Sequence, residues 1–144
     1  MFIYRRTVRF QDTDGAGVMY FANGLAIAHE AYEASLQSTG VDLKAFFKGI
    51  PVAVPIAHAS VDFLRPIAVG DRLEIHLTPA QTRPTEFEIH YQIYLESTPD
   101  KPVFKALTRH VCIDAQTRTR QELPPTLLTW LSQWAEPSAA VLAD

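Results

Sequence analysis

The chain has 144 residues, of which 47% are hydrophobic, enough to close the core of one domain. Its formal net charge is −3, its sequence pI is about 5.9 and its basic residues are scattered, which argues against a dedicated nucleic-acid surface. Cys112 is the single cysteine, which excludes an intrachain disulfide and a cysteine-built metal site. No apolar run resembles a signal peptide or a membrane span, so we expect a soluble, cytoplasmic protein.

The first third of the chain predicts a strand, a turn and a buried helix. Residues 3–10 place branched and aromatic side chains between charged ones, which is typical of a strand. Residues 22–39 predict a helix that stops at Gly40, and residues 42–48 predict a second helical turn. The apolar stripe of the long helix is rich in small side chains, so we expect this helix to lie close against a sheet and to be central. The stripe consists of Leu25, Ala28, Tyr32, Ser35 and Leu36.

The rest of the chain predicts four strands and a last helix. The strand segments are residues 52–64, 72–82, 86–96 and 103–114. The gaps between them are too short for crossover helices, so we expect an antiparallel meander. A pair of prolines opens the last helix, which runs to Trp134 with one apolar side made of Leu127, Leu128, Leu131 and Trp134.

These elements define an α+β domain over residues 1–135, with a five-stranded antiparallel sheet around one long helix and a short C-terminal helix. Residues 136–144 predict a weakly ordered tail. One helix cannot cover both faces of such a sheet, and the uncovered surface favours self-association as a twofold dimer.

Two aspartates and two glycines, within Asp12 to Gly17, lie where the first strand leads into the long helix. Backbone N–H groups at a helix N-terminus are unpaired and carry partial positive charge. They suit an anion or a developing oxyanion, and a carboxylate beside them is a candidate catalytic partner. This junction is therefore the first candidate site.

Three other interpretations of the junction compete. A calcium loop needs oxygen ligands where this chain has Ala16 and Asn23, so calcium is excluded. Aspartyl phosphoryl transfer, as in a magnesium-dependent phosphatase of the haloacid dehalogenase type, needs a parallel sheet with crossover helices and further metal ligands. A plain turn, with glycines for unusual dihedral angles and aspartates as caps, stays open on these residues alone.

The histidines do not form a metal site, because no pair has zinc-ligand spacing with a third ligand in view. His76 and His90 fall on the polar sides of strands, and His29 is best explained as a hydrogen-bonding residue of the long helix. His58 lies within an apolar strand and is a candidate wall residue of a pocket. No serine elbow or nucleotide fingerprint is present, so any chemistry depends on a carboxylate and backbone dipoles.

Two stretches resemble a known family. Residues 8–23, Val-Arg-Phe-Gln-Asp-Thr-Asp-Gly-Ala-Gly-Val-Met-Tyr-Phe-Ala-Asn, resemble the signature of 4-hydroxybenzoyl-CoA thioesterase-like hotdog-fold proteins. Residues 61–71, Val-Asp-Phe-Leu-Arg-Pro-Ile-Ala-Val-Gly-Asp, resemble the family's turn between two sheet strands, and the likeness covers about residues 3–130. It implies the hotdog fold, hydrolysis of an aromatic acyl-CoA without a cofactor, and a dimer or a homotetramer with active sites between subunits.

The resemblance also implies roles for individual residues. The aspartate before x-Ala-Gly is Asp14, although relatives usually have proline or alanine where this chain has Gly15. The backbone N–H that polarises the thioester carbonyl is that of Phe21. The acyl pocket is lined by Val18, Met19 and Tyr20. Coenzyme A contacts are expected from Arg83 and Thr85, with Arg65 as a weaker candidate.

The role of Asp14 is left open between a nucleophile that forms a mixed anhydride and a general base that activates water. Three alternatives to the aromatic thioesterase remain at this point. They are a thioesterase for another aroyl or a short acyl-CoA, a non-catalytic module that binds acyl-CoA, and the magnesium-dependent phosphatase.

Overall fold

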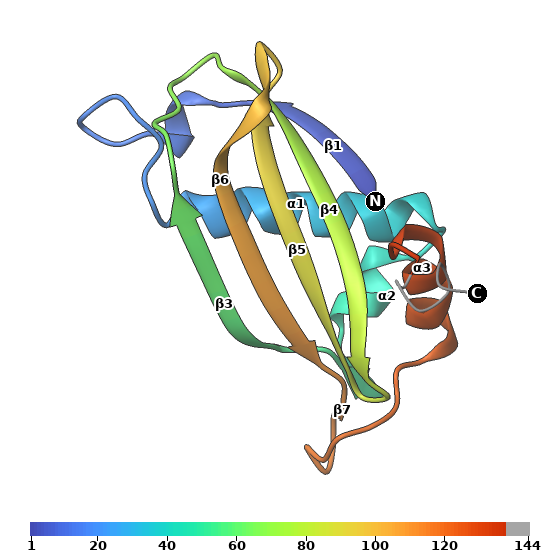
Figure 1. The fold of residues 1–144 in the computed structure, drawn as a ribbon. Coiled ribbons are helices and arrows are strands. Elements are labelled where there is room, and N and C mark those ends of the chain that lie inside the picture. The colour runs from blue at the N-terminus through green and yellow to red at the C-terminus, as the bar shows by residue number, and fades with distance from the viewer. Residues whose placement is uncertain (138–144) are drawn as a thin grey trace.

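The computed structural model describes residues 1–137, in which a five-stranded main sheet folds around one long helix and residues 52–53 and 113–114 form a small two-stranded sheet (Figure 1). Of the predicted tail, residues 138–144 lie outside the described residues. No helix within residues 1–137 is long and apolar enough to cross a membrane. The elements are β1 (Phe2–Thr7), a 3₁₀ turn (Phe10–Asp12), α1 (Asn23–Ser38), α2 (Leu43–Phe47), β2 (Val52–Ala53), β3 (Ile56–Phe63), β4 (Arg72–Arg83), β5 (Glu86–Leu95), β6 (Thr98–Val111), β7 (Ile113–Asp114) and α3 (Pro125–Trp134).

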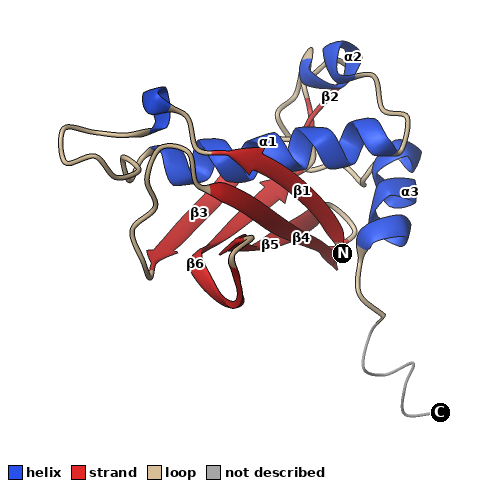
Figure 2. Ribbon diagram, turned by 90° about the horizontal axis from the view of Figure 1, so that it is seen from above, coloured by secondary structure: helices blue, strands red, loops and turns tan. Residues whose placement is uncertain are grey.

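The main sheet has the strand order β1-β4-β5-β6-β3, and every neighbouring pair is antiparallel. α1 crosses one face of it, so that the sheet curves around the helix (Figures 1 and 2). The predicted five-stranded sheet around a central helix is confirmed. The predicted meander holds only for β4, β5 and β6, because β1 occupies the free edge of β4 and β3 therefore pairs with β6 at the far edge.

Three predicted strand boundaries are corrected. β1 ends at Thr7 rather than Phe10, since the chain there turns into the 3₁₀ segment. The predicted strand 52–64 divides into β2 and β3 around Pro55. The predicted break at residues 97–102 belongs to β6, which begins at Thr98; register shifts opposite this segment accommodate its two prolines.

α1 packs on the sheet through small and branched side chains. Ala28 and Ala31 are fully buried, and Ile27 and Leu36 are buried beside them. The alanines let the backbone of α1 approach the sheet closely, which is why the stripe needs no large residue there. Leu25, predicted within the stripe, is half-buried.

α3 covers the end of α1 that lies far from the Asp12–Gly17 junction (Figure 2). Its buried residues are Leu127, Trp130 and Leu131, whereas Leu128 is 43% exposed, so the predicted apolar side is rotated. The Trp130 indole N–H donates a hydrogen bond of 2.9 Å to the hydroxyl of Ser35 on α1. α3 is thus held by a buried aromatic ring and one directed contact.

Trp130 and Leu128 of α3 are expected to differ in how much each side chain contributes to the stability of the fold. Trp130→Ala removes a fully buried indole and is expected to lower the free energy of unfolding by about 3–5 kcal/mol. Leu128→Ala, on the exposed side of α3, should change it by less than about 0.5 kcal/mol. Urea denaturation of both variants measures this; equal losses would contradict the observed orientation of α3.

Candidate active site

Residues 12–20 form a narrow projecting loop between the 3₁₀ turn and α1 (Figure 1). Its two limbs pair, with the Asp14 N–H donating to Val18 O at 3.0 Å and the Tyr20 N–H donating to Asp12 O at 2.8 Å. Gly17 at the tip has φ +82°, a conformation that disfavours other residues. Gly17 therefore closes the loop, and the aspartates lie on its first limb.

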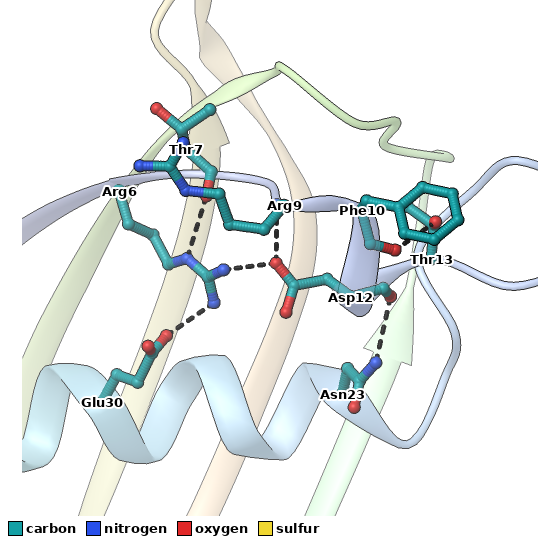
Figure 3. Close-up of polar contacts among 8 residues, drawn as sticks. All are labelled: Arg6, Thr7, Arg9, Phe10, Asp12, Thr13, Asn23 and Glu30. Atoms are coloured by element: carbon teal, nitrogen blue, oxygen red, sulfur yellow. Dashed lines mark hydrogen bonds and ion pairs between the residues drawn. The ribbon is translucent and has the colours of Figure 1, made fainter.

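Asp12 is buried in an ion-pair network that joins β1 to α1 (Figure 3). Its carboxylate pairs with the Arg6 guanidinium and accepts the Arg9 N–H at 2.8 Å. The same guanidinium donates to Glu30 of α1 at 2.6 Å. With these partners, Asp12 fixes the root of the loop and is not free to react with a substrate.

Asp14 is exposed, in contrast to Asp12. Its Oδ1 accepts the Ala16 N–H at 2.8 Å, which fixes the direction of the side chain. The other oxygen, Oδ2, has no hydrogen-bond or ion-pair partner among residues 1–137. Asp14 is therefore the aspartate of this loop with a free carboxylate oxygen.

The N-terminus of α1 has no side-chain cap. Ala22 is at the N-cap, no acidic residue lies in the first turn, and Asn23 uses its amide to donate to Asp12 O at 3.0 Å. Within the described part of the chain, the Phe21 N–H also has no acceptor. The positive end of the helix dipole is thus left open to a ligand.

An apolar groove of about 420 Å³ lies beside this helix start. The Met19 N–H donates to Ile67 O at 2.8 Å, which joins the second limb of the loop to the segment after β3. A Cβ built on Gly24 would lie 3.2 Å from the Phe63 ring, so the groove wall packs directly against the first turn of α1. The groove is lined by Val18, Met19, Phe21, Phe63, Leu64, Arg65, Pro66 and Ile67.

The structure brings some of the predicted site residues together at this groove. Val18, Met19 and Phe21 line the groove, whereas Asp14 is paired with Val18 across the loop and is not itself a lining residue. Tyr20 does not line it; its ring is 45% exposed and packs edge-on against Phe21 at 4.9 Å.

His58 is not brought to the groove. It pairs with Arg109, while its neighbour Ala59 pairs with Thr108 on the helix side of the sheet. Paired residues share a face, so His58 points away from α1. A bulge between Ile56 and His58 causes this, because it breaks the alternation that would have placed both on one face.

Arg83 and Thr85 lie at the hairpin between β4 and β5. β4 begins at Arg72 beside β1 and runs twelve residues away from the loop, so this hairpin is at the opposite end of the sheet. The Thr85 hydroxyl accepts a hydrogen bond of 3.1 Å from Arg120. Within one chain these residues do not join the groove, whereas Arg65 does.

The residues that sequence reasoning missed are the apolar walls Phe63, Leu64 and Ile67. All three lie in the second motif, residues 61–71, which the resemblance identifies only as a turn between two sheet strands. The segment instead passes across the end of the sheet from β3 to β4, and that route places it beside the loop. No group of three potential metal-ligating side chains occurs among residues 1–137.

A buried polar chain lies deeper, between α1 and the sheet. His110 is fully buried, its ring stacks on Phe87 at 4.6 Å, and its Nε2 lies 2.8 Å from the Thr108 hydroxyl. That hydroxyl lies 3.4 Å from the Tyr91 hydroxyl. Burial, with a smaller contribution from His29, lowers the pKa of His110 from 6.5 to about 3, so the ring is neutral at physiological pH.

The fold and the groove agree with the known proteins that this chain resembles. Residues 8–131 match the model of the thioesterase-like superfamily, and the chain belongs to this family. It is a thioesterase of the hotdog fold.

Its relatives include particular enzymes. The 1,4-dihydroxy-2-naphthoyl-CoA hydrolase of Nostoc punctiforme is 56% identical over 90% of this chain and 86% of its own length. That of Crocosphaera subtropica is 52% identical over 89% and 93%. The crystal structure of a 1,4-dihydroxy-2-naphthoyl-CoA thioesterase from Synechocystis superposes with a TM-score of 0.88, at 38% identity over 94% of this chain and 98% of that one.

The two aspartates of the loop should respond differently to amidation. Asp12→Asn breaks a buried ion pair and is expected to cost about 3 kcal/mol of folding free energy. Asp14→Asn retains an oxygen that accepts the Ala16 N–H, and its stability should change by less than about 0.5 kcal/mol. Chemical denaturation compares them; a strongly destabilised Asp14→Asn would contradict the roles assigned here.

His110 predicts a dependence of stability on pH. Its folded pKa of about 3 lies below its unfolded value, so the unfolded chain takes up a proton near pH 6.5 that the folded chain does not bind. The free energy of unfolding should therefore fall by about 1.5 kcal/mol between pH 6.5 and pH 5 from this residue. His110→Gln removes the titrating group, and denaturation over this range should show a shallower slope; an unchanged slope would refute the assignment.

Proposed function

We propose that this thioesterase hydrolyses 1,4-dihydroxy-2-naphthoyl-CoA to 1,4-dihydroxy-2-naphthoate and coenzyme A, as in phylloquinone (vitamin K1) biosynthesis. One geometric observation supports the reaction type: the uncapped start of α1, with the Phe21 N–H open, lies at an apolar groove, and the loop whose second limb lines this groove carries the free carboxylate of Asp14. The acyl group is supported by the relatives of that name, which are 46–56% identical to this chain.

In the proposed mechanism the thioester carbonyl accepts a hydrogen bond from the Phe21 N–H. As the tetrahedral intermediate forms, its oxygen becomes negative and the fixed dipole of the helix start stabilises it. One such donor is typically worth about 2.7–4 kcal/mol of activation free energy. Because the donor is backbone, it is already oriented before the substrate binds.

Asp14 supplies the second function, by one of two routes. As a nucleophile its carboxylate attacks the carbonyl carbon, the C–S bond breaks, and water then hydrolyses the mixed anhydride. As a general base it takes a proton from water while the water oxygen attacks, and the proton passes to the leaving thiolate. Both routes consume one water and release an acid and a thiol, and both need the ionised carboxylate.

We further propose that the working enzyme is an oligomer, a dimer or a dimer of dimers. β3 is an edge strand, and Ile56 and Phe63 on it and Leu64 directly after it are 44–52% exposed. Large apolar side chains on an open strand edge favour pairing with a second copy. Since Arg83 and Thr85 lie far from the groove of their own chain, coenzyme A contacts from them, and from His58, require a neighbouring copy.

A cytoplasmic location is part of the same proposal. Its support is the composition: a single cysteine, Cys112, which is buried and free, and an acidic, mixed-charge sequence.

Asp14→Asn is expected to lower kcat for 1,4-dihydroxy-2-naphthoyl-CoA by about 10²–10⁴-fold, because amidation removes both the nucleophile and the base. Thiol release with a chromogenic disulfide measures it. Asp100→Asn, an exposed aspartate in the turn region of β6, is the matched control and should retain full activity.

Near-normal turnover by Asp14→Asn would refute the assigned chemistry. A panel of benzoyl-CoA, short acyl-CoAs and 1,4-dihydroxy-2-naphthoyl-CoA tests the substrate, and the naphthoyl ester should give the highest kcat/KM. Failure of the wild type to cleave any of them would leave a module that binds acyl-CoA without hydrolysing it.

A further inference from the structure

A second cavity, of about 230 Å³, lies between the first two turns of α1 and the helix side of the sheet. Leu25 and His29 border it from the helix, and Ala59 borders it from β3. Two polar residues from the central strands, Tyr91 and Thr108, also line it, although both are buried. A mostly apolar cavity with two convergent hydroxyl groups suits an aromatic ring that carries a polar substituent.

The direction of the hydrogen bonds behind this cavity follows from His110. Its Nδ1 is buried and has no hydrogen-bond partner among residues 1–137. A buried N–H without an acceptor is rarer and more costly than a buried lone pair without a donor, so the ring hydrogen belongs on Nε2. Nε2 then donates to the Thr108 hydroxyl at 2.8 Å.

The Thr108 oxygen accepts that hydrogen, so its own hydroxyl hydrogen turns to the Tyr91 hydroxyl 3.4 Å away. Tyr91 Oη then accepts from Thr108, and its hydrogen is left to donate to an atom within the cavity. Desolvation raises the pKa of Tyr91, so this hydroxyl stays protonated. The chain His110–Thr108–Tyr91 thus presents one oriented donor to an apolar cavity.

We propose that Tyr91, oriented by Thr108 and His110, is a specificity-determining residue that donates a hydrogen bond to the distal ring oxygen of a hydroxylated aromatic acyl group. This inference rests on the proposed thioesterase function and adds the recognition of the acyl ring. It assigns no bond-making step to Tyr91.

The position of the cavity along α1 agrees with this role. The proposed carbonyl-polarising N–H, that of Phe21, lies two residues before α1, and Leu25, which borders the cavity, lies in the first turn of α1. A thioester held at the helix start can therefore extend its ring along α1 to the mouth of the cavity. The distal oxygen of a bicyclic ring is the one that reaches Tyr91.

The test compares two substrates on one enzyme. 1,4-dihydroxy-2-naphthoyl-CoA carries the distal oxygen, and 1-hydroxy-2-naphthoyl-CoA lacks it but is otherwise the same. The wild type should prefer the dihydroxy ester in kcat/KM by about tenfold, since the analogue leaves a buried donor unpaired. Tyr91→Phe should abolish this preference and leave kcat/KM for the monohydroxy ester within about threefold.

Tyr94→Phe is the matched control, because its hydroxyl lies on the same strand but binds Gln92 at the surface, 2.8 Å away. It should keep the wild-type preference. Thr108→Val removes the group that orients Tyr91 and should reduce the preference while the Tyr91 hydroxyl remains. A loss of activity that is equal for both esters in Tyr91→Phe and Thr108→Val indicates a structural role and overturns the inference.

These assays distinguish a failure of the proposed role of Tyr91 from a failure of the proposed thioesterase function. If the wild type cleaves both naphthoyl esters with equal kcat/KM, the role of Tyr91 is refuted and the thioesterase mechanism stands. If it cleaves neither, the proposed function itself is refuted.

Discussion

The ion-pair link between Arg6, Asp12 and Glu30 fixes the geometry on which the site depends. It joins the end of β1 to the second turn of α1 across the root of the loop (Figure 3). Because Asp12 also accepts the Asn23 amide through its carbonyl, the start of α1 cannot turn independently of β1. The rest of the site, which comprises the loop tip, the open helix start and the groove, is built outward from this link.

Because of this arrangement, Asp12 and Asp14 differ in role although they are only two residues apart. Asp12 is desolvated and paired, which favours a structural role, whereas Asp14 keeps one oxygen in solvent and can be desolvated by a substrate. The Asn23 and Gly24 amides at the start of α1 donate to Tyr20 O and Phe21 O, whereas the preceding amides of Phe21 and Ala22 have no acceptor among residues 1–137. An unsatisfied helix start is a cost to folding, and it becomes useful when a developing oxyanion occupies it.

Much of the fold could be predicted from the sequence, because long periodic segments determine their own secondary structure. The helix over residues 22–39 and the strands β4 and β5 follow from such periods. The pairing of β3 with β6 could not be predicted from the local pattern, since it depends on β1, a distant segment, occupying the edge of β4. The orientation of α3 could not be predicted either, because it depends on the burial of Trp130 and on the hydrogen bond of its indole N–H to Ser35 in a distant helix.

The candidate site, like the fold, could be predicted from the sequence only in part. The motif around Asp14 identified the loop, the helix start and the walls Val18 and Met19, all of which are local in sequence. The walls Phe63 and Ile67 and the hydroxyl of Tyr91 come from distant segments, and only the fold brings them together. His58 was a candidate pocket residue because it lies within an apolar strand; the bulge next to it turns its side chain away from α1, so it does not line the groove of its own chain.

The central claim is that the start of α1 polarises the thioester carbonyl, and vibrational spectroscopy measures this directly. An acyl-CoA with a ¹³C-labelled thioester carbonyl, bound to the inactive Asp14→Asn variant, gives an isotope-edited infrared band for that one bond. The account predicts a shift of this band to lower frequency than in water, because the Phe21 N–H draws charge onto the oxygen. A bound substrate whose carbonyl band stays at or above its value in water would contradict it.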